Sequence, residues 1–336
     1  MHVTSFIKEI SCKKRLGLYA LQLSILYMII LKTKEWNVML NLRKLMFGII
    51  GVVPDKLWLS IMYRRKMGAK LNLDNPKTFN EKLQWLKLYD RRLKHVEMVD
   101  KHAVKQKVAT VIGNEYIIPT LGVWRNAEQI DYESLPTKFV LKCTHDSGGV
   151  YICKNKSCMN KNEANKKMNH FLKKSYYNLY REWPYKMVTP MIIAEQYMED
   201  SDSHELNDYK FFCFNGKVKF FKIDFNRFTN HRANYFNREG KLLPFGEENY
   251  PPDPNKKLKM PDALDEMITL AEKLSVEEIF VRVDFYYCNK KIYFGEMTYY
   301  PQAGFGKFIP VEWDEKIGLE LELPFFGYKC NRPLSL

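Results

Sequence analysis

Two carboxylates in the last quarter of the chain, Asp284 and Glu296, have the spacing that most directly suggests chemistry. Residues 279–286 alternate in period two, and residues 291–298 return after a short polar turn, a pattern that predicts two adjacent antiparallel strands. Because side chains alternate between the faces of a strand, Arg282, Asp284 and Glu296 are expected on a common face. The hairpin therefore presents one carboxylate from each strand beside a cation.

Paired carboxylates on neighbouring strands suit a magnesium ion that holds nucleotide phosphates. Mg²⁺ is a small hard cation that takes few protein ligands and fills its remaining positions with phosphate and water. The hairpin therefore indicates phosphoryl chemistry. One alternative stays open on the hairpin alone: a structural cluster in which Arg282 and Lys210 neutralise the two carboxylates.

A lysine and a glycine-rich loop lie upstream of the hairpin. Residues 138–143 are predicted to form an apolar strand that leaves only Lys142 unburied, and a Ser-Gly-Gly sequence at 147–149 precedes a short strand at 150–153. Glycine backbone can approach phosphates closely and the lysine adds a point charge, so the combination suits a triphosphate. The spacing of a Walker loop is absent. Taken alone, Ser-Gly-Gly is also common in ordinary hairpin turns.

Further polar motifs extend this series along the chain. In chain order they are Asp100-Lys101, Lys142 with the 147–149 loop, residues 193–198, Asp208-Tyr209-Lys210, Arg282-Val283-Asp284 and Glu296-Met297-Thr298. This order resembles the ATP-grasp superfamily, and more closely its branch similar to the teichuronopeptide biosynthesis protein TupA. A segment at 71–86 also resembles the opening of that branch, and the resemblance runs from about residue 52 to about residue 310.

The resemblance implies an α+β, ATP-grasp fold, with two α+β lobes that grip ATP and, here, a helical N-terminal extension. It implies an ADP-forming ligase in which ATP, with Mg²⁺, phosphorylates a carboxylate and an amine attacks the acyl-phosphate to give an amide. The branch also implies a role in cell-surface polysaccharide biosynthesis. The expected substrates there are an amino acid and an acidic sugar or glycan.

The resemblance also implies roles for individual residues. The nucleotide-binding residues are expected to be Lys101, Lys142, Ser147, Gly148, Gly149, Glu195, Gln196 and Met198. Backbone groups of Gln196 and Met198 would read the adenine edge, and either Glu195 or Glu199 would take the ribose hydroxyls. The metal ligands are expected to be Asp284, Glu296 and Thr298, and the catalytic cations Arg282 and Lys210. Thr298 stands where many members of the superfamily have Asn, which weakens the case for a second metal.

Two other functions stay open on the sequence. Asp200-Ser201-Asp202 resembles the DxD motif of nucleotide-sugar glycosyltransferases, although its polar flanks also suit a solvated acidic loop. The other alternative is an inactive scaffold protein that has kept the nucleotide-binding fold. His145, in the glycine-rich loop, either contacts a γ-phosphate or is satisfied locally.

Composition and charge narrow the class of protein. The chain has 336 residues, of which 46% are hydrophobic, enough for two or three lobes around one cleft. Its net charge of +14 is uneven, because residues 1–66 hold twelve Lys/Arg against three Asp/Glu and contribute +9. No arginine-rich stripe or nucleic-acid recognition motif accompanies this charge. We therefore expect an anionic membrane surface or an acidic glycan as the partner, and no nucleic acid.

An uncharged apolar run of sixteen residues, 16–31, lies between basic residues near the N-terminus. Its length falls short of the roughly 20 residues that span a bilayer. We expect either an interfacial anchor, peripheral on the inner face of the cell membrane, or a helix buried against the body. The ATP-dependent body after residue 50 is expected in the cytoplasm.

Four segments are expected along the chain: a basic and apolar extension at 1–50, a helical N-terminal lobe at 51–130, a small lobe with the phosphate lid at 131–200, and a large lobe with the magnesium hairpin at 201–330. The predicted helices are 55–67, 78–88 with a capping box at Thr78 and Glu81, 95–112 carrying Lys101 and Lys105, 162–179 and 262–274. A second hairpin is predicted at 208–225 around Asn215-Gly216. Helices interspersed with antiparallel hairpins give the α+β class.

Overall fold

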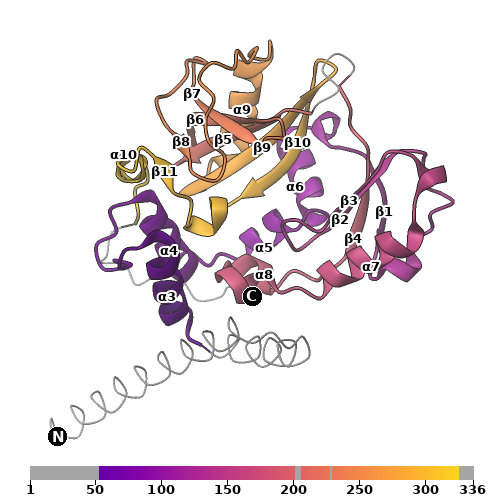
Figure 1. The fold of residues 1–336 in the computed structure, drawn as a ribbon, viewed down its shortest axis with the longest axis horizontal. Helices are drawn as coiled ribbons and strands as arrows, with labels where there is room; N and C mark the ends of the chain where they lie inside the picture. The colour runs from indigo at the N-terminus through magenta and orange to yellow at the C-terminus, as the bar shows by residue number, and fades with distance from the viewer. Residues whose placement is uncertain (1–52, 201–205, 228, 325–336) are drawn as a thin grey trace, which may run out of the picture. The chain divides into compact units, whose positions relative to one another are not determined.

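The computed structural model describes residues 53–200, 206–227 and 229–324. The chain divides into two units between Pro54 and Asp55, and everything below concerns the unit that begins at Asp55. This unit is a mixed α+β structure with antiparallel sheets, as the sequence predicts (Figure 1). The apolar run at 16–31 lies outside the described residues.

The larger sheet has five antiparallel strands in the order β10-β9-β5-β6-β7. They are β5 (Asp208–Phe214), β6 (Lys217–Phe225), β7 (Arg232–Asn237), β9 (Phe280–Cys288) and β10 (Lys291–Thr298). Tight turns join β5 to β6 at Asn215-Gly216 and β9 to β10 at Asn289-Lys290. All four turn residues have positive φ, as a type I′ hairpin turn requires. Both hairpins predicted from the sequence are confirmed.

The two faces of this sheet differ in chemistry. Helix α9 (Leu264–Ser275) covers one face (Figure 1). Phe211 and Cys213 lie on that face, where the Cys213 thiol is 3.9 Å from the carbonyl oxygen of Ala271. Burying an aromatic side chain such as Phe211 contributes about 1.5–3 kcal/mol. Because alternate residues face opposite sides, Asp208 and Lys210 lie on the other face, which is the charged one.

The smaller sheet has four antiparallel strands in the order β1-β4-β2-β3. They are β1 (Thr120–Trp124), β2 (Phe139–Cys143), β3 (Val150–Cys153) and β4 (Ile192–Gln196). Helix α7 (Lys161–Leu172) packs on this sheet (Figure 1). Its buried Met168 belongs to a second hydrophobic core. The edge strand β1 comes from residues 120–124, a segment that the sequence assigned to the preceding helical lobe.

The chain before the smaller sheet is mainly helical and begins with α3 (Asp55–Met67) and α4 (Phe79–Tyr89). The capping box predicted at the start of α4 is confirmed. The Thr78 hydroxyl accepts a hydrogen bond from the Glu81 N–H, and the Glu81 carboxylate accepts one from the Thr78 N–H, each at 3.2 Å. Helix α10 (Trp313–Glu320) packs against α4.

The single helix predicted at 95–112 is wrong, because the chain forms two helices there, α5 (Lys94–Val99) and α6 (Ala103–Ile112). The side chain of Asp100 accepts hydrogen bonds from two N–H groups that follow it, at 2.8 and 3.3 Å. Such local bonds compete with helix continuation and start a new helix instead. Lys101 therefore lies in a break between helices.

The single helix predicted at 162–179 is also wrong, because α7 is followed by a separate short helix, α8 (Tyr176–Tyr180). Ser175 is the N-cap of α8, with its hydroxyl accepting from the Asn178 N–H at 3.2 Å. The helices predicted at 55–67, 78–88 and 262–274 are confirmed, with ends that differ by at most two residues.

Short elements complete the described part of the chain. Strand β8 (Gly246–Glu247) pairs with β11 (Phe308–Ile309), and 3₁₀ turns lie at η1 (Asn114–Tyr116), η2 (Ala127–Gln129), η3 (Lys156–Cys158), η4 (Trp183–Lys186) and η5 (Pro301–Gly304). Across the described ranges, no helix has both the length and the apolar character of a membrane span.

Candidate functional site

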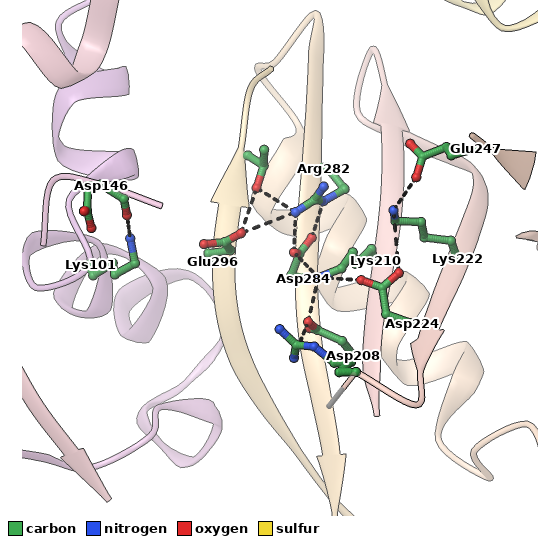
Figure 2. A network of polar contacts seen from close by, with 12 residues as sticks. Lys101, Asp146, Asp208, Lys210, Lys222, Asp224, Glu247, Arg282, Asp284 and Glu296 are labelled. Atoms are coloured by element: carbon green, nitrogen blue, oxygen red, sulfur yellow. Dashed lines mark hydrogen bonds and ion pairs between the residues drawn. The ribbon is translucent and has the colours of Figure 1, made fainter. Parts of the chain in front are cut away.

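A row of charged side chains crosses the face of the larger sheet that lies opposite α9 (Figure 2). The strand register pairs Asp284 of β9 with Lys210 of β5 on one side and with Glu296 of β10 on the other. A bulge at Gly295 interrupts the β10 register next to Glu296. The structure therefore brings both predicted carboxylates and Lys210 onto one face.

Arg282 connects the two carboxylates. Its guanidinium donates to both oxygens of Asp284, from Nε to Oδ1 at 2.7 Å and from Nη2 to Oδ2 at 2.6 Å. The same Nη2 lies 3.3 Å from Glu296 Oε1 and 3.0 Å from Thr298 Oγ1. Four predicted site residues thus form one connected cluster.

Lys210 is buried among three carboxylates. Its Nζ lies 2.7 Å from Asp208 Oδ2, 3.0 Å from Asp284 Oδ2 and 3.6 Å from Asp224 Oδ2. Burial raises the pKa of Asp284, although Arg282 and Lys210 both oppose that shift. The carboxylates in turn hold the pKa of Lys210 above its ordinary value, despite burial. Lys210 is therefore a fixed positive charge at the base of the site.

Four cations act on the carboxylate of Glu296, whose side chain is 43% exposed. Burial alone would raise the pKa of Glu296, but Lys101, Arg282, Lys210 and Lys142 lower it to about 2. Two of these cations are on the larger sheet, one is on β2 of the smaller sheet, and Lys101 precedes α6. Positive charge from separate elements thus converges on one point, which favours a multiply charged anion there.

Glu195 of β4 holds two lysines beside the smaller sheet. Its oxygens lie 2.6 Å from Lys142 Nζ and 2.5 Å from Lys105 Nζ. Burial alone would raise the pKa of Glu195, but these two lysines lower it to about 2. Lys105 also donates to the carbonyl of Ile118 at 2.8 Å. The sequence analysis gave Lys105 no role in the site. The sequence feature that could have indicated one is its spacing of four residues from Lys101.

The glycine-rich loop closes the β2–β3 hairpin and is tied to Lys101. The N–H of Lys101 donates to the carbonyl of Thr144 at 3.1 Å, and its Nζ donates to the carbonyl of Asp146 (Figure 2). Asp146 Oδ1 accepts from the Gly149 N–H at 3.3 Å. Gly148 has a φ of 111°, a conformation that residues with a Cβ rarely adopt. The loop is therefore a hairpin turn that also carries a cation at its edge.

Two more loop residues have local partners. Burial raises the pKa of the Tyr176 phenol on α8, and the nearby hydroxyl of Ser147 opposes that rise. His145 is buried, and its Nε2 lies 3.1 Å from the carbonyl of Lys174. Burial lowers the pKa of His145, which favours a neutral ring. These contacts favour a local role for His145 over contact with a γ-phosphate.

The expected adenine hinge lies at the end of β4. The N–H of Gln196 donates to the carbonyl of Pro119 at 3.1 Å, so this donor is not free to read an adenine edge. Met198 lies just beyond β4 in a segment without regular structure. Glu199 pairs with Lys138 at 2.8 Å, away from the Glu195 cluster. The hinge residues are therefore next to Glu195 in sequence, but Gln196 and Glu199 have partners other than Lys142 and Lys105.

The oxygen donors of the hairpin suit one magnesium ion. Within the described residues, Glu296 Oε2 has no hydrogen-bond partner, whereas both oxygens of Asp284 already contact cations. In the same ranges, no group of three or more His, Cys, Asp or Glu side chains is arranged to hold a metal by itself. Two carboxylates nevertheless fit an ion that takes its other ligands from phosphate and water.

The charged row continues beyond the residues that the sequence singled out. On β6, Lys222 Nζ lies 2.8 Å from Glu247 Oε2 and 3.6 Å from Asp224 Oδ1 (Figure 2). Arg227 Nη1 lies 2.9 Å from Asp208 Oδ2. Strand alternation was the signal for Lys222 and Asp224, which are two positions apart on β6.

A family model described as TupA-like ATPgrasp matches residues 81–322, and no curated protein matches the chain. Among solved structures, a D-alanine–D-alanine ligase from Helicobacter pylori is similar, with 15% identity, a TM-score of 0.35 and coverage of 73% of this chain and 69% of that one. An L-amino acid ligase from Bacillus licheniformis has 12% identity, a TM-score of 0.42 and coverage of 72% and 54%. The ATP-grasp ligase PsnB complexed with minimal precursor has 8% identity, a TM-score of 0.35 and coverage of 65% and 57%. The chain thus spans between 54% and 69% of the length of these structures.

Proposed function

Because this chain belongs to the TupA-like ATP-grasp family, we propose that it is an ATP-dependent, ADP-forming ligase that joins a carboxylate to an amine. The observation that carries the proposal is that Glu296 and Asp284 lie opposite each other on adjacent strands and share Arg282, while the charges of Lys101 and Lys142 help to lower the pKa of Glu296. A structural carboxylate pair needs only enough charge to neutralise it, and Arg282 with Lys210 already does so. The additional Lys101 and Lys142 are better explained by an anion that binds from outside.

In the first step of this proposal, the γ-phosphoryl group of ATP passes to the carboxylate substrate. Lys101 and Lys142 bind phosphate oxygens, and the backbone of the loop Ser147-Gly148-Gly149 covers them. Arg282 and Lys210 neutralise charge on the transferred group. In phosphoryl transfer the protein contributes mainly position and charge neutralisation, which this arrangement supplies.

Asp284 and Glu296 would hold a magnesium ion, with the Thr298 hydroxyl beside them. When bound, the ion would neutralise phosphate charge and help to align the phosphoryl group. Arg282 keeps the two carboxylates together at close distance, which otherwise repel each other. The ion would therefore share these carboxylates with Arg282, which already contacts both oxygens of Asp284 and one oxygen of Glu296.

In the second step, the nitrogen of the amine attacks the carbonyl carbon of the acyl-phosphate. A C–N bond forms, the C–O bond to phosphate breaks, and the products are the amide, ADP and inorganic phosphate. We assign Glu195 to fixing the positions of Lys142 and Lys105. We assign recognition of the adenine edge of the nucleotide to the backbone around Gln196 and Met198. The Gln196 N–H is excluded from that role by its bond to Pro119.

For the substrates we propose an amino acid and an acidic sugar or glycan in cell-surface polysaccharide biosynthesis. The support is the family, together with the +9 charge of residues 1–66, which suits acidic glycans and anionic headgroups. On the same ground we propose that the protein works in the cytoplasm, peripheral to the inner face of the membrane. Release from sedimented membranes by high salt tests this location.

The experiment that tests the proposed reaction works whichever amine is the natural substrate. Protein, ATP and Mg²⁺ are incubated with hydroxylamine and a panel of amino acids and uronic acids. Hydroxylamine traps an acyl-phosphate as a hydroxamate, which is read together with the nucleotide product. The proposal expects ADP and a hydroxamate with at least one carboxylate. AMP in place of ADP, or no hydroxamate with any carboxylate while a nucleotide sugar is consumed, would contradict it.

No observation favours the glycosyltransferase alternative. Asp200 accepts a hydrogen bond from the Asn289 N–H at 2.9 Å, and Asp202 lies outside the described residues. An inactive scaffold remains the outcome if the protein binds ATP but forms neither ADP nor hydroxamate.

A further inference from the structure

One basic surface of the protein has no role in the reaction proposed above. It lies on residues 161–190, which include α7, α8 and η4 (Figure 1). These residues hold seven Lys/Arg against two Asp/Glu, whereas residues 191–324 hold seventeen Lys/Arg against twenty-four Asp/Glu. An anionic surface is therefore attracted to the first of these segments and repelled by the second.

The outward face of α7 and the residues just after it carry four lysines. Ala164 and Met168, four residues apart on the helix, are fully buried. Because residues three or four apart share a face, the opposite face of α7 is open to solvent. The lysines exposed there are Lys166, Lys167, Lys173 and Lys174. Within the described residues none of these four forms an ion pair, whereas Lys161 at the start of α7 pairs with Glu133 at 2.7 Å.

Lys186 of η4 extends this charge beyond α7. It is exposed, and its Nζ lies 5.1 Å from the ring centre of Tyr177 in α8. Met187, which follows it, is 55% exposed. Lys174 Nζ lies 3.8 Å from the ring centre of Phe171 in α7. Ammonium groups beside apolar side chains suit a lipid interface, where the charge meets headgroups. We name these five lysines the basic patch: Lys166, Lys167, Lys173, Lys174 and Lys186.

The start of the described unit is fixed beside the basic patch. Asp55, the first residue of α3, accepts a hydrogen bond from the hydroxyl of Tyr177 at 2.8 Å and pairs with Arg181 at 3.0 Å. Tyr177 is also the residue whose ring lies beside Lys186. Residues 1–54 are joined to the unit at Asp55, and they contain eight Lys/Arg, two Glu and the uncharged apolar run described above. The attachment point of this basic and apolar segment therefore lies next to the basic patch.

We propose that the basic patch binds an anionic lipid surface, on the side of the protein where residues 1–54 are attached. The inference rests on the membrane location in the proposed function, because it names the surface that contacts the membrane, but it does not depend on the ligation chemistry. Apolar burial and attraction to anionic headgroups strengthen membrane binding together, which favours a lipid surface over an acidic glycan as the partner. His145 Nε2 of the glycine-rich loop lies 3.1 Å from the carbonyl of Lys174, so binding through the patch brings that loop close to the lipid surface.

The test measures binding of the full chain to vesicles. The vesicles contain either phosphatidylcholine alone or equal amounts of phosphatidylcholine and phosphatidylglycerol, and bound protein is measured by flotation at low and high salt. Soluble polygalacturonate is the glycan probe. Wild type is compared with Lys166→Gln/Lys173→Gln, which neutralises two exposed lysines of the patch. Lys256→Gln/Lys257→Gln is the matched control, because it removes the same charge from two exposed lysines between β8 and α9.

We expect wild type to bind the anionic vesicles and to be partly released by high salt, because salt screens the charges. In Lys166→Gln/Lys173→Gln, binding should weaken by about 20-fold, which is about fivefold for each lysine near an anionic surface. The control should stay within about threefold of wild type, because charges more than a Debye length from the surface are screened. Lys167→Gln/Lys174→Gln should weaken binding like the first variant, and it replaces that variant if it does not fold. Hydroxamate formation from a soluble carboxylate should stay at the wild-type rate in every variant.

Three results would overturn the inference: equal weakening by the patch variant and the control, equal binding of wild type to neutral and anionic vesicles, or weaker binding of the patch variant to polygalacturonate with unchanged binding to vesicles. The last result would assign the patch to an acidic glycan instead. A wild-type protein that binds neither kind of vesicle would remove the proposed membrane location, and this inference with it. The hydroxamate assay tests the ligation separately, so a failure of the proposed reaction is distinguishable from a failure of the patch.

Discussion

Glu296 lies directly opposite Asp284 across the β9–β10 ladder, and one guanidinium nitrogen of Arg282 lies 3.3 Å from the first carboxylate and 2.6 Å from the second. Two carboxylates this close need a cation between them. Arg282 provides it in the protein alone, and Lys101 and Lys142 add positive charge from other elements. The proposed chemistry depends on this one contact region.

Lys142→Ala should weaken ATP binding. Lys142 is paired with Glu195 at 2.6 Å and contributes to the positive field at Glu296. Losing a charged contact to phosphate costs about 1.5–3 kcal/mol, which is roughly 10- to 100-fold in affinity. Titration calorimetry with a non-hydrolysable ATP analogue and Mg²⁺ measures the change.

Lys138→Ala is the matched control for that variant. Lys138 directly precedes β2, but its ammonium group pairs with Glu199 and its side chain is 51% exposed. Its loss should leave affinity within about threefold, as expected for an exposed ion pair. Equal effects of the two substitutions would argue against a phosphate role for Lys142.

The ion pairs of Glu195 should appear in the pH dependence of stability. The pKa of Glu195 is lowered from its ordinary 4.5 to about 2 in the folded protein. A lowered folded-state pKa stabilises the protein above pH 4.5, and this contribution is lost as the pH falls from about 4.5 towards 2. In Glu195→Gln, the free energy of unfolding at pH 7 should be lower by about 3 kcal/mol and should depend less on pH across that window. Urea unfolding followed by circular dichroism at several pH values measures both quantities.

Glu320→Gln provides the comparison, because its partner Lys219 and Glu320 itself are both exposed. That variant should keep the wild-type pH dependence. If Glu195→Gln also keeps it, the Glu195 pairs with Lys142 and Lys105 contribute no net stability.

Local patterns in the sequence predicted much of the fold. The capping box at Thr78 and the Asn215-Gly216 turn depend on neighbouring residues alone, so they could be predicted without tertiary information. Alternation along β9 and β10 also placed Asp284 and Glu296 on one face. Each of these signals acts over a few residues.

The errors arose where contacts distant in sequence decide the structure. Lys101 was assigned to a continuous helix, but Asp100 ends that helix and the Lys101 N–H bonds to Thr144, more than forty residues away. The periodicity of the helical segment gives no information about the bond between Lys101 and Thr144. Lys105 was missed for the same reason, because its partner Glu195 comes from another element.

Lys87→Met should destabilise the protein strongly. The Lys87 ammonium is fully buried and donates to Gln84 Oε1 and to the carbonyls of Tyr180 and Ala303. Methionine fills a similar volume but removes the donor from Gln84 Oε1 and from the Tyr180 carbonyl, at about 1–3 kcal/mol each, whereas the Ala303 carbonyl keeps its bond from Gln84 Nε2. We expect the free energy of unfolding to fall by about 3 kcal/mol or more in a denaturant titration.

Lys107→Met, which removes an exposed lysine paired with Glu97, should change stability by less than about 1 kcal/mol. A Lys87→Met protein as stable as Lys107→Met would show that Lys87 does not hold Tyr180 and the loop around Ala303 together.

The most direct test of the account is the nucleotide product formed by wild type and Glu296→Gln with ATP, Mg²⁺, a carboxylate panel and hydroxylamine, followed by ³¹P NMR. The wild-type protein should form ADP and hydroxamate in equal amounts. Glu296→Gln should keep its fold but lose about 100-fold or more of this activity, because a preorganised charge at the reacting phosphate is removed. Glu248→Gln, an exposed carboxylate paired with Lys307, should behave as wild type. AMP as the product, or Glu296→Gln turnover equal to wild type, would show that this chain is not an ADP-forming ligase that uses the Asp284 and Glu296 hairpin.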